Sequence, residues 1–469
     1  MTAPAGGSTA SSPPLLQRPL ASYYLVVGCT ALLLALGLVM VLSASSVVAY
    51  DESGSSFTFF VKQAVWVGLG LPLLWLAARL PVRAYRMLGY PLLVVSLFLL
   101  LLVLVPGVGH KANGATRWID LGGPLRVQPS EPAKLALVLW GADLLVRKRR
   151  LLTEWKHLLV PLLPVTGLLV LLVMVGRDLG TSLVILTIFL ALLWVVGAPA
   201  RLFALVVTGI GAVVTLMIIT EPYRIRRITG FLNPFADLQG SGWQGAQGIY
   251  ALASGGWVGL GLGASREKWD YLPHAHTDFI YAIIGEELGL VGAVVVLLLF
   301  ATLAYAGVRI AQRTRDPFAR LAAGAVTAWL AVQAFVNIGA VLGVLPITGI
   351  PLPLISFGGS ALLPTMVALG MLLSFAKREP GAPAALAARA AAMRARLPWL
   401  PDWLLAADRT AARVLARLSS VASLAPTSAS PTPTCPTPTC PTPTRPTAAP
   451  PRRRAPARSR AGSGESRRR

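Results

Sequence analysis

Ten long apolar runs, separated by short polar segments, occupy most of the chain up to residue 375. They lie at 23–43, 57–78, 88–105, 133–146, 158–175, 182–196, 202–219, 279–308, 321–344 and 361–375. A helix needs about 20 mostly apolar residues to cross a bilayer, and several runs reach that length. Charged residues make up only 13% of the chain, against about 25% in an ordinary soluble domain. The sequence therefore predicts an all-α, polytopic integral membrane protein with about ten transmembrane helices.

The basic residues between the runs predict how the chain is oriented. If the N-terminus is cytoplasmic, the loops that are rich in Arg and Lys fall on the cytoplasmic side, as the positive-inside rule requires. Those loops hold Arg79, Arg83, Arg86, Arg147, Lys148, Arg149, Arg150, Lys156, Arg201, Arg309, Arg313, Arg315 and Arg320. An even number of spans makes both termini cytoplasmic and leaves residues 220–278 as one large extracytoplasmic loop.

The two ends of the chain differ in composition from the region between them. Residues 1–20 are rich in Ser, Pro, Ala and Gly and are predicted to be disordered, and residues 21–378 form the transmembrane domain. Residues 379–469 form a basic, Pro/Thr/Ala-rich cytoplasmic tail that is mostly disordered, with a basic helix over about 383–420. The net charge is +23. Because no nucleic-acid-binding motif accompanies it, this charge predicts contact with anionic lipid and no nucleic-acid partner.

The densest group of ionisable and aromatic residues outside the tail lies just before the eighth run. It ends in His274-Ala-His-Thr-Asp278, where a loop meets an apolar helix at the outer face. Asp278 suits a general base that takes a proton from a sugar hydroxyl. Glu286 lies about 12 Å further along a helix, too far to share that proton. The alternative is that Asp278 only stabilises the positive end of the helix.

Polar residues also mark the start of the fourth run. Glu131 and Lys134 are three positions apart and face the same side of a helix. They predict a buried polar pair that lines a cavity, or alternatively a cap with a local ion pair. In the preceding outer loop, Arg117 beside Trp118 suits a phosphate contact, although both side chains could instead anchor the loop in the membrane interface.

The segment 345–360 is too rich in Pro and Gly to form a regular helix. An apolar, irregular segment at membrane depth must pack inside protein or line a cavity. We predict that Ser356 in this segment contacts substrate, as do Gly358, Gly359 and Ser360, whose amides lie where the last helix begins and suit an anion. A purely structural re-entrant loop explains the same pattern.

Five stretches in this order resemble the SEDS family of shape, elongation, division and sporulation proteins over about residues 20–378. They are Asn113–Trp118, Gln128–Lys134, Asp178–Thr181, His276–Ile280 with Gly285–Gly289, and Thr348–Ser360. The stretch Gly37–Ser46 resembles the cell-division branch of the family more than the elongation branch. Pro132, Arg177 and His274 depart from residues that are usual in the family.

The resemblance implies a glycosyltransferase that polymerises lipid II into peptidoglycan strands and releases undecaprenyl pyrophosphate. It implies action at the division septum of the bacterial plasma membrane, with a class B penicillin-binding transpeptidase and other division proteins as partners. The family's essential outer-face aspartate falls on Asp278, and its helix-start glutamate and lysine fall on Glu131 and Lys134.

The leaving pyrophosphate needs a positive charge. Arg117, Lys134 or a divalent cation, Mg or Mn, could supply it, but the sequence shows no cluster of metal ligands. Two alternatives stay open, a flippase for the same lipid-linked precursor and a non-enzymatic scaffold of the division machinery.

Overall fold

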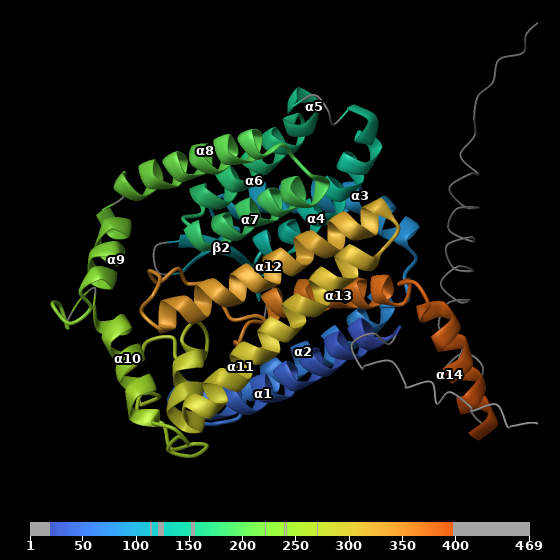
Figure 1. The fold of residues 1–469 in the computed structure, drawn as a ribbon. Helices are drawn as coiled ribbons and strands as arrows, with labels where there is room; N and C mark the ends of the chain where they lie inside the picture. Colours follow the sequence, from blue (N-terminus) through green and yellow to red (C-terminus); the bar gives the residue numbers. More distant parts are fainter. Residues whose placement is uncertain are drawn as a thin grey trace, which may run out of the picture. The chain divides into compact units, whose positions relative to one another are not determined.

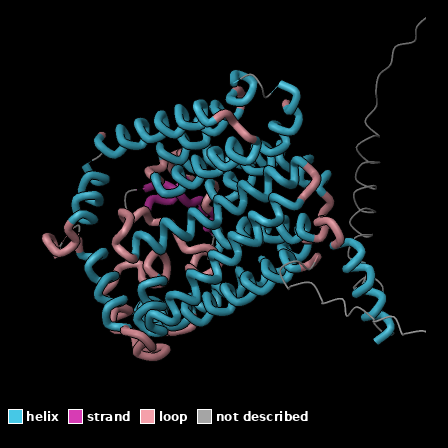
Figure 2. Tube along the Cα trace, in the orientation of Figure 1, coloured by secondary structure: helices cyan, strands magenta, loops and turns pink. Residues whose placement is uncertain are grey.

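The computed structural model describes residues 19–396 apart from positions 113–114, 121–125, 152–154, 221, 239, 241 and 270, and it is mostly helical (Figure 2). The ten apolar runs all become helices. These are α1 (Ala21–Ser53), α2 (Thr58–Ala77), α3 (Val82–Val103), α4 (Ser130–Arg147), α6 (Leu162–Val175), α7 (Leu179–Val196), α8 (Ala200–Ile219), α11 (Ile280–Arg313), α12 (Pro317–Val341) and α13 (Gly359–Ala376). The predictions for residues 1–18 and 397–469 fall outside the described part of the chain.

Eight of these ten helices are long and apolar enough to cross a bilayer. The other two are α4, which carries Glu131, Lys134, Asp143 and Arg147, and α6, which has 14 residues. The prediction of an all-α, multi-pass membrane protein is confirmed, with α4 and α6 as the two weakest of the predicted spans.

Helix α12 lies in the middle of the bundle and packs against α11, α7 and α4 (Figure 1). Its Trp329 and Phe318 are fully buried. In α8, by contrast, Leu202 is the one buried residue among those described, so this helix lies at the edge of the bundle. A buried polar side chain on α12 is therefore costly in free energy unless it has a hydrogen-bond partner within the protein.

A small sheet covers the end of the bundle at which α4 begins. Strands β1 (Gly109–Ala112), β2 (Ala115–Asp120) and β3 (Arg126–Val127) pair antiparallel in the order β1-β2-β3. The predicted large loop also contains two helices, α9 (Pro222–Leu232) and α10 (Trp243–Gly255), which connect α8 to the loop before α11 along one side of the bundle (Figure 1). The short elements η2 (Arg149–Leu151), α5 (Trp155–Leu159) and α14 (Ala382–Arg396) lie in other connections.

Helix α11 is interrupted at Gly289, whose φ of 67° and ψ of −168° are not helical. At this break the backbone of residues 256–261 bonds to α11. Leu260 N donates to Glu286 O over 3.0 Å, and Leu290 N donates to Gly256 O over 2.9 Å. A Cβ at position 289 would lie 2.6 Å from Trp257 O. Only glycine allows this approach, which fixes the outer loop to the helix that follows Asp278.

Candidate functional site

Asp278 lies in a tight turn immediately before α11. The carbonyl of His274 accepts hydrogen bonds from Thr277 N at 3.0 Å and Phe279 N at 3.3 Å. His274 has a positive φ of 60°, which is uncommon for a residue with a side chain. Asp278 is half-buried, whereas Phe279 beside it is fully buried. The turn thus holds a half-buried carboxylate immediately before α11.

The irregular segment between α12 and α13 packs against this turn. Ser356 Oγ donates to Thr277 O over 2.6 Å and accepts from Leu352 N over 2.8 Å. Phe357 N donates to His276 O over 3.1 Å. The hydroxyl of Ser356, which was predicted to contact substrate, therefore holds two parts of the main chain together.

Gly349 in the same segment faces the carboxylate. A Cβ at this position would lie 3.6 Å from Asp278 Oδ2, and the residue has a φ of +72°. The positive φ favours glycine here, and the 3.6 Å contact shows that this segment lies directly beside the carboxylate.

Charged groups from several elements surround Asp278. Burial raises the pKa of Asp278, the charges of His274, Arg227 and Arg117 lower it, and the charge of Asp178 raises it, with a net rise. Burial and the charge of His274 lower the pKa of the neighbouring His276 to about 4, so this imidazole is neutral at neutral pH. A carboxylate whose pKa is raised toward neutrality is a stronger base than an ordinary aspartate.

Arg117 on β2 lies beside the N-terminus of α7. Its Nη2 donates to Arg177 O over 2.7 Å, and its Nε lies 3.9 Å from Asp178 Oδ2. Asp178 caps α7 by accepting from Thr181 N over 3.0 Å, and it also accepts from Gln128 Nε2 over 3.1 Å. The side chain of Arg117 remains 32% exposed. This exposure leaves the guanidinium accessible to an anion near Asp278.

A second arginine whose charge acts on Asp278 is Arg227, on α9. Its Nη1 donates to Ile347 O over 3.1 Å, which joins α9 to the segment that faces Asp278. Sequence reasoning missed Arg227 as a site residue because the helix that carries it was not expected.

The start of α13 is tied to neighbouring helices. Ser360 Oγ accepts from Gln128 N over 2.7 Å, and Gly358 N donates to Gln63 Oε1 over 3.4 Å. Gly359 packs so closely on Trp66 that a Cβ would lie 2.1 Å from the indole ring. Of the amides predicted to bind an anion, that of Gly358 therefore already donates to Gln63, and the hydroxyl of Ser360 is also bonded.

Glu131 and Lys134 are buried inside the bundle, with exposed fractions of 2% and 1%. Lys134 Nζ lies 2.8 Å from Glu131 Oε1 and 3.2 Å from Gln333 Oε1, and it also lies 5.0 Å from the ring centroid of Trp329. The predicted pair exists, but its contacts are with α12. Sequence reasoning missed Gln333, although a polar residue within an apolar run was a usable signal.

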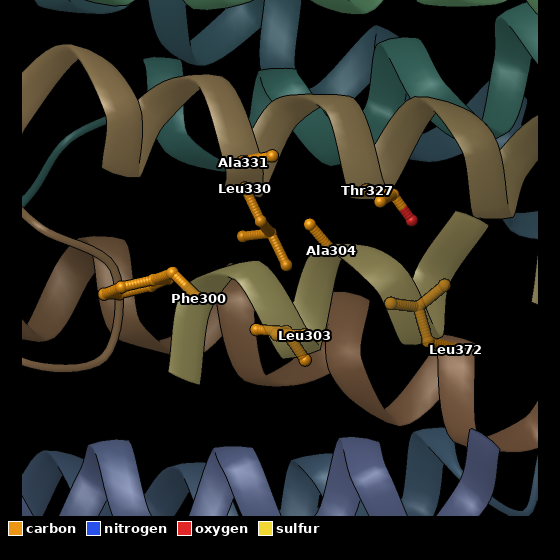
Figure 3. Close-up of a pocket in the computed structure, with 7 residues that line it drawn as sticks. All are labelled: Phe300, Leu303, Ala304, Thr327, Leu330, Ala331 and Leu372. Atoms are coloured by element: carbon orange, nitrogen blue, oxygen red, sulfur yellow. The ribbon is translucent and has the colours of Figure 1, made fainter. Parts of the chain in front are cut away.

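An apolar pocket lies between α11, α12 and α13 and is separate from these polar groups (Figure 3). It is lined by Phe300, Leu303, Ala304, Thr327, Leu330, Ala331 and Leu372. None of these side chains is ionisable, so the pocket has no group for acid–base chemistry.

Residues 23–380 match the family described as cell cycle protein, which groups FtsW, RodA and SpoVE. The chain is 43% identical over 373 residues to a probable peptidoglycan glycosyltransferase FtsW of Mycobacterium tuberculosis, covering 80% of this chain and 71% of that protein. It is 40% identical to stage V sporulation protein E of Bacillus subtilis, covering 75% of this chain and 96% of that protein.

Two solved structures share the fold. One comes from work on polymerisation and crosslinking by a peptidoglycan synthase complex. It is 32% identical, has a TM-score of 0.62, and covers 75% of this chain and 96% of that one. The other is the rod shape determining protein RodA of Thermus thermophilus, which is 31% identical with a TM-score of 0.55. The match covers 76% of this chain and 97% of that one.

Proposed function

The chain belongs to the family of FtsW, RodA and SpoVE cell cycle proteins, and we propose on that premise that it is a peptidoglycan glycosyltransferase. Its substrate is lipid II, which it polymerises into glycan strands during septal wall synthesis. The observation that carries this proposal is the Asp278 carboxylate, half-buried among Arg117, Arg227 and His274. Its relatives named as peptidoglycan glycosyltransferases support the same reaction class.

In the proposed reaction, Asp278 takes the proton from the 4-hydroxyl of the acceptor N-acetylglucosamine. The freed oxygen attacks the anomeric carbon of the donor chain, and the bond from that carbon to the pyrophosphate oxygen breaks. Undecaprenyl pyrophosphate leaves with the bonding electrons, and the anomeric carbon inverts. A positioned general base contributes about 10²–10⁴-fold to such a step.

The leaving pyrophosphate gains negative charge, which fixed cations stabilise. Arg117 and Arg227 serve this purpose, because both act electrostatically on Asp278 from different elements. Lys134 is less suited, because its ammonium group is buried and already bonded to Glu131 and Gln333. We therefore assign Lys134 and Glu131 no direct contact with the pyrophosphate.

A divalent cation held by protein side chains alone does not fit the donor groups of the described residues. No three His, Cys, Asp or Glu side chains come together in that part of the chain. The acidic groups at the site, Asp278 and Asp178, are accompanied by arginines. The proposed reaction therefore has no step that depends on a metal held by the protein alone.

We further propose that the Asp278 end of the bundle is extracytoplasmic and that both termini are cytoplasmic. This orientation places the basic loops inside. The likeness to a chain from a peptidoglycan synthase complex supports a class B penicillin-binding transpeptidase as partner, at the division septum with other division proteins.

The test is glycan polymerisation by the purified protein with its transpeptidase, in detergent, from labelled lipid II. We expect Asp278→Asn to lose at least 100-fold in rate, while Asp120→Asn on β2 retains activity because its partner is Arg126, 3.7 Å away. A flippase or a scaffold makes no polymer in detergent. An Asp278→Asn protein that polymerises as fast as wild type would refute the role of this carboxylate.

A further inference from the structure

Two buried amides lie one turn apart on α12 and face the segment that borders Asp278. Gln333 and Asn337 have exposed fractions of 2% and 3%. A buried amide is costly unless its donors and acceptors are paired, so the partners of these two side chains indicate what they do.

Asn337 binds the two chain segments that meet at the site. Its Nδ2 donates to the main-chain oxygen of Asp278 and to that of Ile350, both over 2.8 Å. The reverse orientation of the amide would place its oxygen against two carbonyl oxygens, so the hydrogen bonds determine the assignment. Asn337 therefore holds Asp278 at a defined distance from the segment that faces it.

Gln333 connects the same segment to the buried ion pair. Its Nε2 donates to Pro351 O over 3.0 Å. Its Oε1 accepts from Lys134 Nζ over 3.2 Å and from Trp329 Nε1 over 2.8 Å. A cation bonded to the amide oxygen polarises the amide and strengthens the bond that its nitrogen donates.

We propose that Gln333 and Asn337 are positioning residues for Asp278, and that the Lys134–Glu131 pair acts on Asp278 through Gln333 and Pro351 without touching the substrate. The continuous path is Glu131, Lys134, Gln333, Pro351, then Ile350, Asn337 and Asp278. This inference rests on the proposed role of Asp278 as the base.

The path explains why a charged pair is kept inside the bundle. A buried lysine costs several kcal/mol in lost hydration, which its partners must offset. The hydrogen bonds to Glu131 and Gln333 and the cation–π contact with Trp329 offset that cost and also connect α4 to α12. A displacement of about 1 Å at a catalytic group can reduce the rate about 100-fold, so this connection has a direct consequence for rate.

The experiment compares kcat, KM for lipid II and the pH dependence of polymerisation in the purified complex. The variants are Gln333→Met, Asn337→Ala and Asn337→Leu, which remove the hydrogen bonds with different changes in volume. The matched control is Thr327→Val on the same helix, since Thr327 is buried and its hydroxyl donates to Ala323 O, at 2.7 Å, within that helix.

We expect kcat to fall about 10- to 100-fold in the three variants, with KM changed less than twofold. The acid limb of the pH profile should also move to lower pH. Burial is the largest influence on the pKa of Asp278, larger than the charge of Asp178, which raises it, and the charges of His274, Arg227 and Arg117, which lower it. A looser turn that admits water therefore lowers this pKa. A smaller fraction of folded protein would lower the activity by the same factor at every pH and leave the midpoint of the acid limb unchanged.

Wild-type kcat and an unmoved acid limb in the Gln333 and Asn337 variants would overturn the inference, as would an equal loss in Thr327→Val. Asp278→Asn, measured alongside, separates the positioning role of Gln333 and Asn337 from the proposed role of Asp278 as the base. If Asp278→Asn is inactive and the α12 variants are normal, only the positioning role fails. If Asp278→Asn is active, the proposed function itself fails.

Discussion

Ser43 on α1 donates its hydroxyl to the carboxylate of Glu287 on α11, with Oγ 2.6 and 2.7 Å from the two carboxylate oxygens. Lys268 Nζ lies 3.8 Å from the same carboxylate. Neighbouring Glu286 accepts from Ser265 Oγ over 2.5 Å and from Arg266 N over 2.9 Å. The two glutamates therefore hold the outer loop 265–268 against α11 and are not part of the Asp278 cluster.

Replacing Ser43 by Ala should destabilise this attachment. The substitution removes a donor from a carboxylate that is 1% exposed, which typically costs about 1–3 kcal/mol. We expect a lower unfolding temperature in detergent and faster proteolytic cleavage within 263–268. The matched control is Ser46→Ala, because the hydroxyl of Ser46 bonds within α1, to Ser43 O. Equal stability of the two variants would contradict a structural role for the Ser43–Glu287 contact.

Glu267 should make stability depend on pH. One of its carboxylate oxygens is buried without a hydrogen-bond partner, and burial together with the charge of Glu286 raises its pKa to about 7. An unfolded glutamate titrates near 4.3. The folded state thus holds a proton that the unfolded state has lost, and the resulting stability is present below about pH 4.3 and is lost as pH rises through about 7.

Glu267→Gln should therefore raise the unfolding temperature at pH 8 and reduce the difference between pH 5 and pH 8. Glu52→Gln, at an exposed position near the end of α1, provides the control. The measurement is thermal unfolding of the detergent-solubilised protein at both pH values. If the unfolding temperatures of Glu267→Gln at pH 5 and pH 8 differ as much as those of the wild type, another group causes the pH dependence of stability.

Asp143 is fully buried between two arginines of unequal exposure. Arg86 Nε lies 2.7 Å from Oδ1 with its side chain 36% exposed, and Arg147 Nε lies 2.6 Å from Oδ2 with its side chain 60% exposed. Arg147→Ala should cost less than Arg86→Ala, because the Arg147 side chain is mostly in solvent and Arg86, the less exposed arginine, still pairs with the carboxylate. Arg86→Ala should cost about 1–3 kcal/mol, because it leaves a buried carboxylate with a mostly solvated partner. Denaturation of both variants checks this order, and a larger loss in Arg147→Ala would contradict it.

Gly289→Ala should be far more harmful than an alanine in a regular helix. The φ of 67° is strained for alanine, and the new Cβ would meet Gly259 N at 2.4 Å. We expect poor yield of folded protein and loss of polymerisation. Gly28→Ala on α1 should be tolerated, because nothing lies within 4 Å of its Cβ position. Size-exclusion profiles of the two variants provide the comparison, and a normal Gly289→Ala protein would argue against a tight contact at the break.

The features that sequence reasoning predicted are local ones. An apolar run is enough to predict a span, and the spacing of Glu131 and Lys134 is enough to predict that they meet, as they do over 2.8 Å. The position of Asp278 where a loop meets a helix also follows from its neighbours in the chain, and α11 begins two residues later, at Ile280.

The features that it missed depend on residues far apart in the chain. Gln333 bonds to Lys134 across 199 positions, and Asn337 reaches Asp278 across 59. The break at Gly289 lies in a sequence that reads as continuous helix, and it exists because residues 256–261 approach closely in the folded protein. Local periodicity carries no information about such contacts, so the role of α12 could be inferred only from the structure.

The pH dependence of kcat/KM for lipid II polymerisation tests the catalytic role of Asp278 most directly. We expect activity to rise with pH along an acid limb whose midpoint lies above 3.9, the approximate value for an ordinary aspartate, because burial raises the pKa of Asp278. Glu267→Gln should retain this limb, which separates Asp278 from Glu267, another carboxyl group whose pKa is raised. A wild-type profile that is flat from pH 4 to 8, or a limb that disappears in Glu267→Gln, would contradict a base at Asp278.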